Sequence, residues 1–335
     1  MMGMFESSRG TSLDLSSFDT SKVLTMERMF YDTKIKSLNL SSFNTSSVTS
    51  MYQMFANSLI SSIDISSFDT SSVEHMDHMF SESEITSIDL SNFNTESIYY
   101  ISYMFNSCKN LTSLNLSSFN MEKVSDANCM FENCINLKSL ELWKPSINRI
   151  TSMNNMFRNT GLETLDLSKI NTTDVIFIDH LFTNSYHLKS INFGNFDTSK
   201  VTSMANMFEN CYSLESLDLS NLNVINVKNM QYMFRNCSNL KQINISNFNT
   251  QNLEKIDSMF RETGLESLDL SNLNTSKVKD MDLLFYNSKN LKSINFGNFD
   301  TSKVTSMANM SENYYSLESL DLSSFDTSRV TSYVS

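Results

Sequence analysis

INFGNFDTSKVTSMANMFEN spans residues 191–210, and the chain writes it again as INFGNFDTSKVTSMANMSEN at residues 294–313. The two copies differ at one position, where Phe208 corresponds to Ser311. A stretch copied almost letter for letter indicates a repetitive architecture rather than a set of ordinary domains. The composition agrees, because the 335 residues include only 6 Gly and 1 Pro, too few to punctuate ordinary turns.

A short apolar motif of the type Leu-Asp-Leu recurs along the whole chain with a period of 25 or 26 residues. Its thirteen anchor positions are Leu13, Leu38, Ile63, Ile88, Leu114, Leu140, Leu165, Ile191, Leu217, Ile243, Leu268, Ile294 and Leu320. This period lies within the range of leucine-rich repeats, and LTSLNL at 111–116 matches the strand part of such a repeat. We therefore predict a single solenoid over residues 1–335 with about 13 strands.

The full repeat reads L-x-S-L-[DN]-[LF]-S-x-F-[DN]-T-S-x-V-x-x-M-x-x-M-F-x-x-[CST]. This unit resembles the BspA-like leucine-rich repeat surface proteins, in their Met- and Phe-rich branch, and the resemblance covers essentially the full chain. It implies a location at the cell surface or outside the cell and a role in adhesion or binding. It implies no catalytic residues.

The repeat letters themselves predict the fold class. Strand alternation in L-x-S-L-D-L-S directs Leu inward and Ser and Asp or Asn outward. The segment 198–208, TSKVTSMANMF, has apolar residues at i, i+3, i+6 and i+7, which predicts a short helix capped by Thr198 or Ser199. The predicted fold is an α/β solenoid, a right-handed coil like that of leucine-rich repeats, with one parallel sheet face and short helices opposite, at 25–26 residues per repeat.

Further columns of residues are predicted to face the core. The Met column is interpreted as a deformable core rather than a cofactor site. The Thr column is expected to face inward, because Met121, Ile147 and Val224 replace it in some repeats. The inward Phe column comprises Phe18, Phe43, Phe68, Phe93, Phe119, Phe196, Phe248, Phe299 and Phe325.

The cysteines also follow the repeat. Four of the five, Cys108, Cys134, Cys211 and Cys237, share a column with Ser and Thr, which predicts tight, semi-buried structural thiols. The fifth is Cys129. Because no C-x-x-C pair is present, we expect neither a disulfide framework nor a zinc site.

The outward strand column is the first candidate binding surface. It reads Asp14, Asn39, Asp64, Asp89, Asn115, Glu141, Asp166, Asn192, Asp218, Asn244, Asp269, Asn295 and Asp321. Strands lie ~4.8 Å apart, so the strict alternation from Asp166 onward lets an amide donate to each carboxylate instead of placing like charges side by side. Two interpretations stay open: a ladder that satisfies itself, or a surface for a cationic or hydroxyl-rich partner.

Trp143 is the only tryptophan, and it aligns with an outward Ser of the other repeats. An exposed indole there would anchor a partner or stack on a sugar, with Lys144 adding positive charge. The alternative is that Pro145 removes the core Phe of this coil and Trp143 bends over the defect. The predicted binding residues are Trp143, Lys144, Glu141, Asp166, Asn192, Asp218, Asn244 and Asp269.

Charge excludes some partners. The formal net charge of -12 and the pI near 4.8 argue against nucleic acid, and they favour no anionic membrane surface. His75 and His78 could touch one metal ion, but no third ligand is evident, so no metal or cofactor is expected. We find no nucleophile motif, phosphate-binding loop or acid pair that stands apart from the repeat, and we predict no enzyme activity.

The two chain ends and an internal duplication are further features of the sequence. No apolar run is long enough to insert into a membrane, and residues 1–10 do not read as a signal peptide. Both ends fall within a repeat, so we expect a fragment of a longer surface protein, or self-association through uncapped ends. Residues 161–263 and 264–335 are related by a four-repeat duplication, in which Tyr314 would supply the ring lost at Ser311.

The predicted function is non-enzymatic adhesion or binding to a protein or glycan on another cell surface, through the Ser-Asp/Asn-Ser sheet face. The location would be the cell surface or the extracellular medium. An intracellular leucine-rich-repeat scaffold for protein interactions is the alternative.

Overall fold

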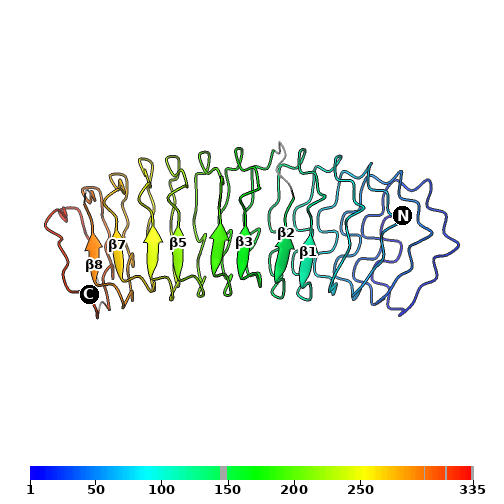
Figure 1. The fold of residues 1–335 in the computed structure, drawn as a ribbon, viewed down its shortest axis with the longest axis horizontal. Coiled ribbons are helices and arrows are strands. Elements are labelled where there is room, and N and C mark those ends of the chain that lie inside the picture. The colour runs from blue at the N-terminus through cyan, green and yellow to red at the C-terminus, as the bar shows by residue number, and fades with distance from the viewer. Residues whose placement is uncertain (144–148, 298, 314, 333–335) are drawn as a thin grey trace. The chain divides into compact units, whose positions relative to one another are not determined.

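The computed structural model of the chain describes residues 1–143, 149–297, 299–313 and 315–332. It divides into two compact units. The first unit comprises Met1–Leu162 and Lys169–Asn171, and the second comprises Glu163–Ser168 and Thr172–Ser335. Within each unit the chain forms successive coils, one beside the next, and the strands of neighbouring coils run parallel (Figure 1). Each unit is therefore a parallel β-solenoid.

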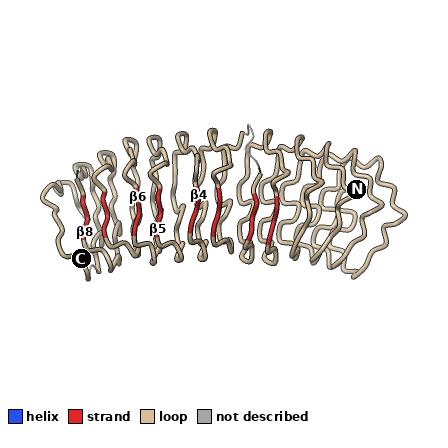
Figure 2. Tube along the Cα trace, in the orientation of Figure 1, coloured by secondary structure: helices blue, strands red, loops and turns tan. Residues whose placement is uncertain are grey.

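Eight short strands lie at the predicted anchors (Figure 2). They are β1 (Ser113–Asn115) and β2 (Ser139–Glu141) in the first unit, and β3 (Thr164–Asp166), β4 (Ser190–Asn192), β5 (Ser216–Asp218), β6 (Gln242–Asn244), β7 (Ser267–Asp269) and β8 (Ser293–Asn295) in the second. They pair in parallel as β1–β2, β3–β4, β5–β6 and β7–β8, with Leu165 opposite Ile191. This register of one repeat confirms the 25–26-residue period.

The remaining predicted strands lie at the ends of the chain. Around Leu13, Leu38, Ile63, Ile88 and Leu320 the described backbone forms no strand element. One parallel bridge, between Asn39 and Asp64, continues the pairing there. The sheet face is therefore less continuous than the sequence repeat.

A second parallel ladder, which the sequence-based prediction missed, runs along the residue just before the first Met position of the repeat, where some coils have Ile or Ala instead. In the first unit it joins Thr25, Ser50, His75, Tyr100, Asp126 and Ser152. In the second unit it joins Phe177, Ser203, Asn229 and Lys255, and further along Asp280, Ser306 and Ser332. These bridges join adjacent coils on a second face, in addition to the face on which the strands pair.

The predicted helix over 198–208 is wrong, and no helix occurs among the residues that the structure describes. Asn206 and Asn210 have φ of 58° and 61°, in the left-handed region, which breaks an α-helix. The segment instead makes two successive turns, in which Met207 N–H donates to Met204 O at 3.3 Å and Glu209 N–H donates to Asn206 O at 3.1 Å.

Backbone bonds between coils explain why turns replace the helix. The N–H groups of Met204, Asn206, Phe208 and Asn210 donate to carbonyls of the next coil at 2.8–2.9 Å. A helix would direct these N–H groups along its own axis and leave the neighbouring coil without them. The apolar side chains still point inward as predicted, because two turns bury the same positions that one helical face would bury.

The buried Phe residues at the end of the Met-Phe segment form a stack in each unit. In the first unit the rings of Phe30 and Phe55 lie 5.6 Å apart and nearly parallel. In the second unit Phe182, Phe208, Phe234, Phe260 and Phe285 follow one another at 5.5–5.8 Å. The inward position predicted for Phe208 within 198–208 is confirmed. The other Phe column, also predicted to face inward, is half-buried at Phe18 and Phe325 and buried at Phe43, Phe68, Phe93, Phe119, Phe196, Phe248 and Phe299.

The Thr column is also buried, and it bonds adjacent coils to each other. Thr275 Oγ1 donates to Asp300 O at 2.8 Å and accepts a bond from Asp300 N–H at 2.8 Å. Thr45 makes the same two bonds with Asp69. The predicted inward orientation is confirmed, and the hydroxyl adds a hydrogen-bonding role that a purely apolar interpretation leaves out.

The five cysteines are free thiols and are buried. The four that share a column are completely buried, so the semi-buried expectation is corrected. Each donates its S–H to a Phe carbonyl of the preceding coil, as Cys237 does to Phe208 O at 3.1 Å. Burial raises the pKa of Cys237 to about 12, which keeps this thiol protonated.

Candidate functional site

The outward face of the sheet carries the polar side chains that the sequence predicts there. In β3, β5 and β7 the central Leu is buried, and the residues before and after it are exposed. The side chain of the last strand residue accepts a hydrogen bond from the backbone two residues later. Asp218 Oδ1, for example, accepts the Ser220 N–H at 2.9 Å. This bond holds the pKa of Asp218 below its ordinary value. Among the other predicted residues, Asp166, Asn192, Asn244 and Asp269 accept the same backbone bond.

Asp and Asn of neighbouring strands form the predicted pairs. Asn192 Nδ2 donates to Asp166 Oδ1 at 3.0 Å, and Asn295 does the same to Asp269 at 3.1 Å. Asn244 contributes to the lowered pKa of Asp218. These pairs coincide with the strand pairs β3–β4, β7–β8 and β5–β6. In the first unit Glu141 is exposed opposite Asn115. Whether the face also holds a partner stays a prediction.

Trp143 does not lie on this face. Its side chain is completely buried, and the indole Nε1 has no hydrogen-bond partner among the described residues. The expectation of an exposed anchor is therefore wrong, and Trp143 leaves the candidate site as a core residue. Lys144 and Pro145 lie outside the described residues, as do Ile147 of the Thr column and Tyr314.

His75 and His78 each stack on the ring of a neighbouring tyrosine. The His75 ring stacks on Tyr100 with centroids 4.4 Å apart, and the His78 ring stacks on Tyr103 at 4.5 Å. Partial burial lowers the pKa of His78 and so favours the neutral ring. No group of three metal-binding side chains occurs among the described residues.

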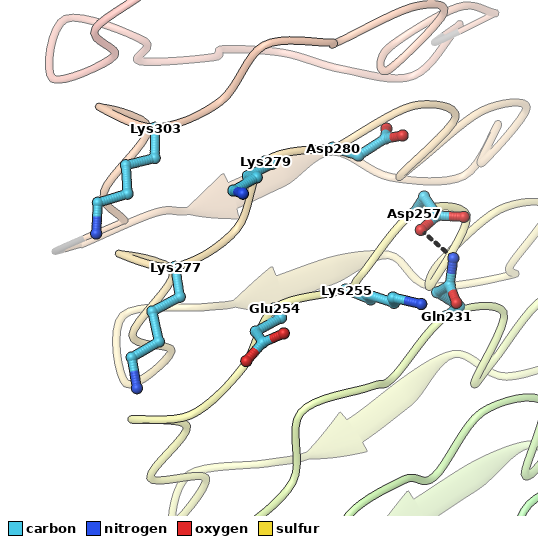
Figure 3. A pocket seen from close by; sticks show the side chains of 8 residues that line it. All are labelled: Gln231, Glu254, Lys255, Asp257, Lys277, Lys279, Asp280 and Lys303. Atoms are coloured by element: carbon cyan, nitrogen blue, oxygen red, sulfur yellow. Dashed lines mark hydrogen bonds between the residues drawn. The ribbon is translucent and has the colours of Figure 1, made fainter.

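The surface of the second ladder carries a hollow that the sequence-based prediction missed (Figure 3). Its volume is about 580 Å³, and it is lined by Gln231, Glu254, Lys255, Asp257, Lys277, Lys279, Asp280 and Lys303. Lys277 and Lys303 extend in the same direction at one side, whereas Asp257, Asp280 and Gln231 lie at the other. We call this hollow the lysine groove. The sequence feature that could have indicated this groove is a Lys at the same repeat position in two successive coils, Lys277 and Lys303.

The comparison with protein families decides where the chain belongs. The family model described as "Mycoplasma protein of unknown function, DUF285" matches residues 1–86, 58–162, 151–267 and 262–335, which together span the whole chain. The chain belongs to the DUF285 family. The resemblance to BspA-like repeats, a finer assignment, stays a prediction for this DUF285 protein. Among the curated proteins, none matches it significantly.

Several solved structures of leucine-rich repeat proteins are similar to this DUF285 protein. A leucine-rich repeat protein from Bacteroides ovatus is 17% identical, with a TM-score of 0.41, and the match covers 81% of this chain and 63% of that one. A leucine-rich cell surface protein from Faecalibacterium prausnitzii is 17% identical, with a TM-score of 0.43 and coverage of 84% and 75%. A leucine-rich repeat protein from Eubacterium ventriosum is 14% identical, with a TM-score of 0.40 and coverage of 91% and 88%.

Two facts bound the functional interpretation. The DUF285 chain spans less than two thirds of the Bacteroides ovatus protein. In the part of the chain that the structure describes, no helix is long or apolar enough to cross a membrane.

Proposed function

We propose that this DUF285 protein is a non-enzymatic binding protein that acts at the cell surface or outside the cell. It would hold a protein or glycan partner on the Ser-Asp/Asn-Ser face of its strands. The observation that carries the proposal is the repeated exposure of polar side chains at the same strand positions, on strands whose central residue faces the buried core.

The energetics support a binding role for this face. The backbone bonds to Asp218 and Asp269, and the Asn295–Asp269 bond, fix the direction of the carboxylates before a partner arrives. A side chain already held in place loses little conformational freedom on binding, which favours affinity. The strand spacing of ~4.8 Å would present such groups to an extended partner at regular intervals.

Arrays of host-surface proteins and glycans, probed with the intact chain, test the proposal. Ser216 and Ser267 are exposed first residues of β5 and β7. Ser216→Arg and Ser267→Arg would cover the face without removing an Asp or an Asn. We expect the double variant to lose the partners that the wild-type chain retains. The matched control is Ser238→Arg, an exposed turn residue. Unchanged binding by the double variant contradicts the proposed face.

The location is tested separately. We expect an antibody against the chain to label intact cells that produce the native protein. Labelling that appears only after the cells are permeabilised would favour the intracellular scaffold instead.

A further inference from the structure

Charge pairs between adjacent coils follow one pattern in the second unit. Lys189 Nζ lies 2.7 Å from Glu163 Oε2, and Lys292 Nζ lies 3.1 Å from Glu266 Oε2. In each case the cation follows the anion by one repeat, in the same column. Opposite charges in adjacent coils are the favourable arrangement, and like charges directly opposite are destabilising.

One column of the lysine groove departs from this pattern, whereas Glu254 and Lys279, at equivalent positions of adjacent coils, follow its order of acid before base. Lys200 Nζ pairs with Asp174 Oδ1 at 2.5 Å, in a column that continues with Lys277 and Lys303. These two lysines occupy equivalent positions of adjacent coils, where the pattern would place one acid and one base. Lys277 Nζ donates to the neutral Asn252 Oδ1 at 2.8 Å. Of the four groove lysines, none forms an ion pair with any other described residue.

The duplication shows that stacking does not require these lysines. At the offset of 103 residues, Asp174 corresponds to Lys277 and Lys200 corresponds to Lys303. Ile176 of the first copy corresponds to Lys279. The first copy forms the same turns and ladder bonds with an ion pair and an apolar side chain at these positions. The second copy therefore gathers positive charge at a place where the fold tolerates other residues.

The opposite side of the groove is acidic and polar. Asp257 Oδ1 accepts a bond from Gln231 Nε2 at 2.6 Å, and Asp280 Oδ1 accepts the Asp282 N–H at 2.8 Å. Burial, with the nearby Asp282 and Asp257 carboxylates, raises the pKa of Asp280. Carboxylate and amide oxygens on this side suit a ligand that donates hydrogen bonds, whereas the ammonium groups suit one that carries negative charge.

We propose that the lysine groove binds an acidic sugar, a glycan unit that carries a carboxylate or sulfate group. Lys277, Lys279 and Lys303 hold the anionic group. The sugar hydroxyls donate to Asp257 and Asp280. The volume of about 580 Å³ is of the size that small ligands occupy.

An acidic sugar fits better than a nucleic acid. The net charge of -12 and the carboxylates inside the groove repel a dense row of phosphates. A glycan places its charges farther apart and offers hydroxyls between them. This site is separate from the strand face, so the inference does not depend on the function proposed above.

Isothermal titration calorimetry with the full chain tests the inference. The probes are oligogalacturonate, which is carboxylated, dextran sulfate, and unmodified dextran of the same length. We expect the two acidic probes to bind, more weakly at high salt, and the neutral probe to show no binding. K277D restores an acid–base pair with Lys303, as in the first copy, and we expect about a tenfold loss of affinity, which corresponds to one charge-assisted contact.

Matched variants separate the groove from general charge effects. K241D makes the same charge change at an exposed residue that does not line the groove, and we expect it to bind like the wild type. Equal losses in K277D and K241D would overturn the proposal. So would unchanged binding by K277D, binding of neutral dextran, or tighter binding of a DNA oligomer. The Ser216→Arg and Ser267→Arg variants should keep their affinity for the acidic probes, so failure of the strand-face function and failure of the groove are distinguishable.

Discussion

The two copies of the duplicated block in the second unit, residues 172–223 and 275–326, share a frame and differ in what the frame carries. The frame repeats in detail, since Asp179 Oδ1 accepts the Ala205 N–H at 3.0 Å and its counterpart Asp282 accepts the Ala308 N–H at 2.6 Å. The side chains on the second ladder repeat only in part, because Ser203 corresponds to Ser306 whereas Phe177 corresponds to Asp280. Contacts between coils are therefore kept, while outward positions vary.

One core position also differs between the copies. Phe208 is fully buried, whereas its counterpart Ser311 is exposed. The ring of Phe296 instead contacts Phe325 at 4.8 Å, where the first copy has Leu222. The ring missing from the stack is thus partly replaced by a ring of the following coil. The prediction that Tyr314 replaces it stays untested, because Tyr314 lies outside the described residues.

The largest expected effect on stability is that of placing the serine of the second copy at the equivalent position of the first copy. Phe208→Ser removes a ring that stacks on Phe182 at 5.5 Å and on Phe234 at 5.6 Å, in the middle of the column. We expect a loss of about 3–5 kcal/mol in the free energy of unfolding, because a cavity replaces the ring. Urea denaturation followed by circular dichroism measures it.

The reverse substitution, in the second copy, should have little effect. Ser311→Phe should alter stability by less than about 1 kcal/mol, since this position is exposed and no ring follows it in the described stack. If both substitutions change the urea midpoint equally, the two copies do not differ in their packing as we describe.

The buried Thr column should show the opposite behaviour, with equal effects in both copies. Thr172 Oγ1 accepts the Asp197 N–H at 2.6 Å, and its counterpart Thr275 accepts the Asp300 N–H at 2.8 Å. Thr→Val at either position keeps the shape but leaves buried backbone groups unpaired, at a cost of about 1–3 kcal/mol. Urea midpoints measure the loss, with the exposed Thr305→Val as control. A loss in one copy alone would contradict a shared frame.

The regular spacing of the repeats, 25 or 26 residues, predicts much of this fold from sequence. The spacing of the anchors gave the strand register, and the columns of Phe, Met, Thr and Cys were assigned to the core correctly. The helix was wrong because its apolar spacing is also produced by two turns. A signal was present in the recurrent Asn at the second left-handed position, since Asn tolerates this conformation. The residues concerned are Asn57, Asn133, Asn159, Asn184, Asn210, Asn236, Asn287 and Asn313.

The candidate site was less predictable for a physical reason. The Asp–Asn pairing follows from the known spacing of strands, so sequence alone could anticipate it. The burial of Trp143 could not be anticipated, because alignment to an outward Ser does not fix the direction of a larger side chain next to an irregular segment. The lysine groove joins residues of several columns, and their convergence depends on the turns that replaced the helix.

Transferring the groove lysines to the first copy has a smaller effect on stability and a larger one on binding. The double variant D174K/I176K replaces the exposed Asp174–Lys200 ion pair with two lysines. We expect a loss of less than about 1 kcal/mol, as for other exposed pairs, and a gain of affinity for oligogalacturonate, measured by calorimetry. A variant that gains no affinity would show that the acidic side of the groove, which Phe177 interrupts in the first copy, is also required.

The smallest expected effect concerns the pH dependence of Asp280. Burial and the neighbouring carboxylates raise its pKa above the ordinary value of 3.8. The folded state therefore binds a proton more readily than the unfolded state, so the Asp280 charge destabilises the fold at neutral pH. This destabilisation disappears as the pH falls below the unfolded value. We expect D280N to raise the urea midpoint slightly at pH 7 and to match the wild type near pH 3.

Asp269 provides a control of opposite sign. The Ser271 N–H bond lowers its pKa, so its charge stabilises the fold above the unfolded value, and this stability is lost as the pH falls through the lower folded value. D269N should therefore lower the urea midpoint at pH 7. If D280N also lowers the midpoint at pH 7, the Asp280 carboxylate is stabilised by the groove lysines, and the two sides of the groove are then already paired with each other rather than available to a sugar.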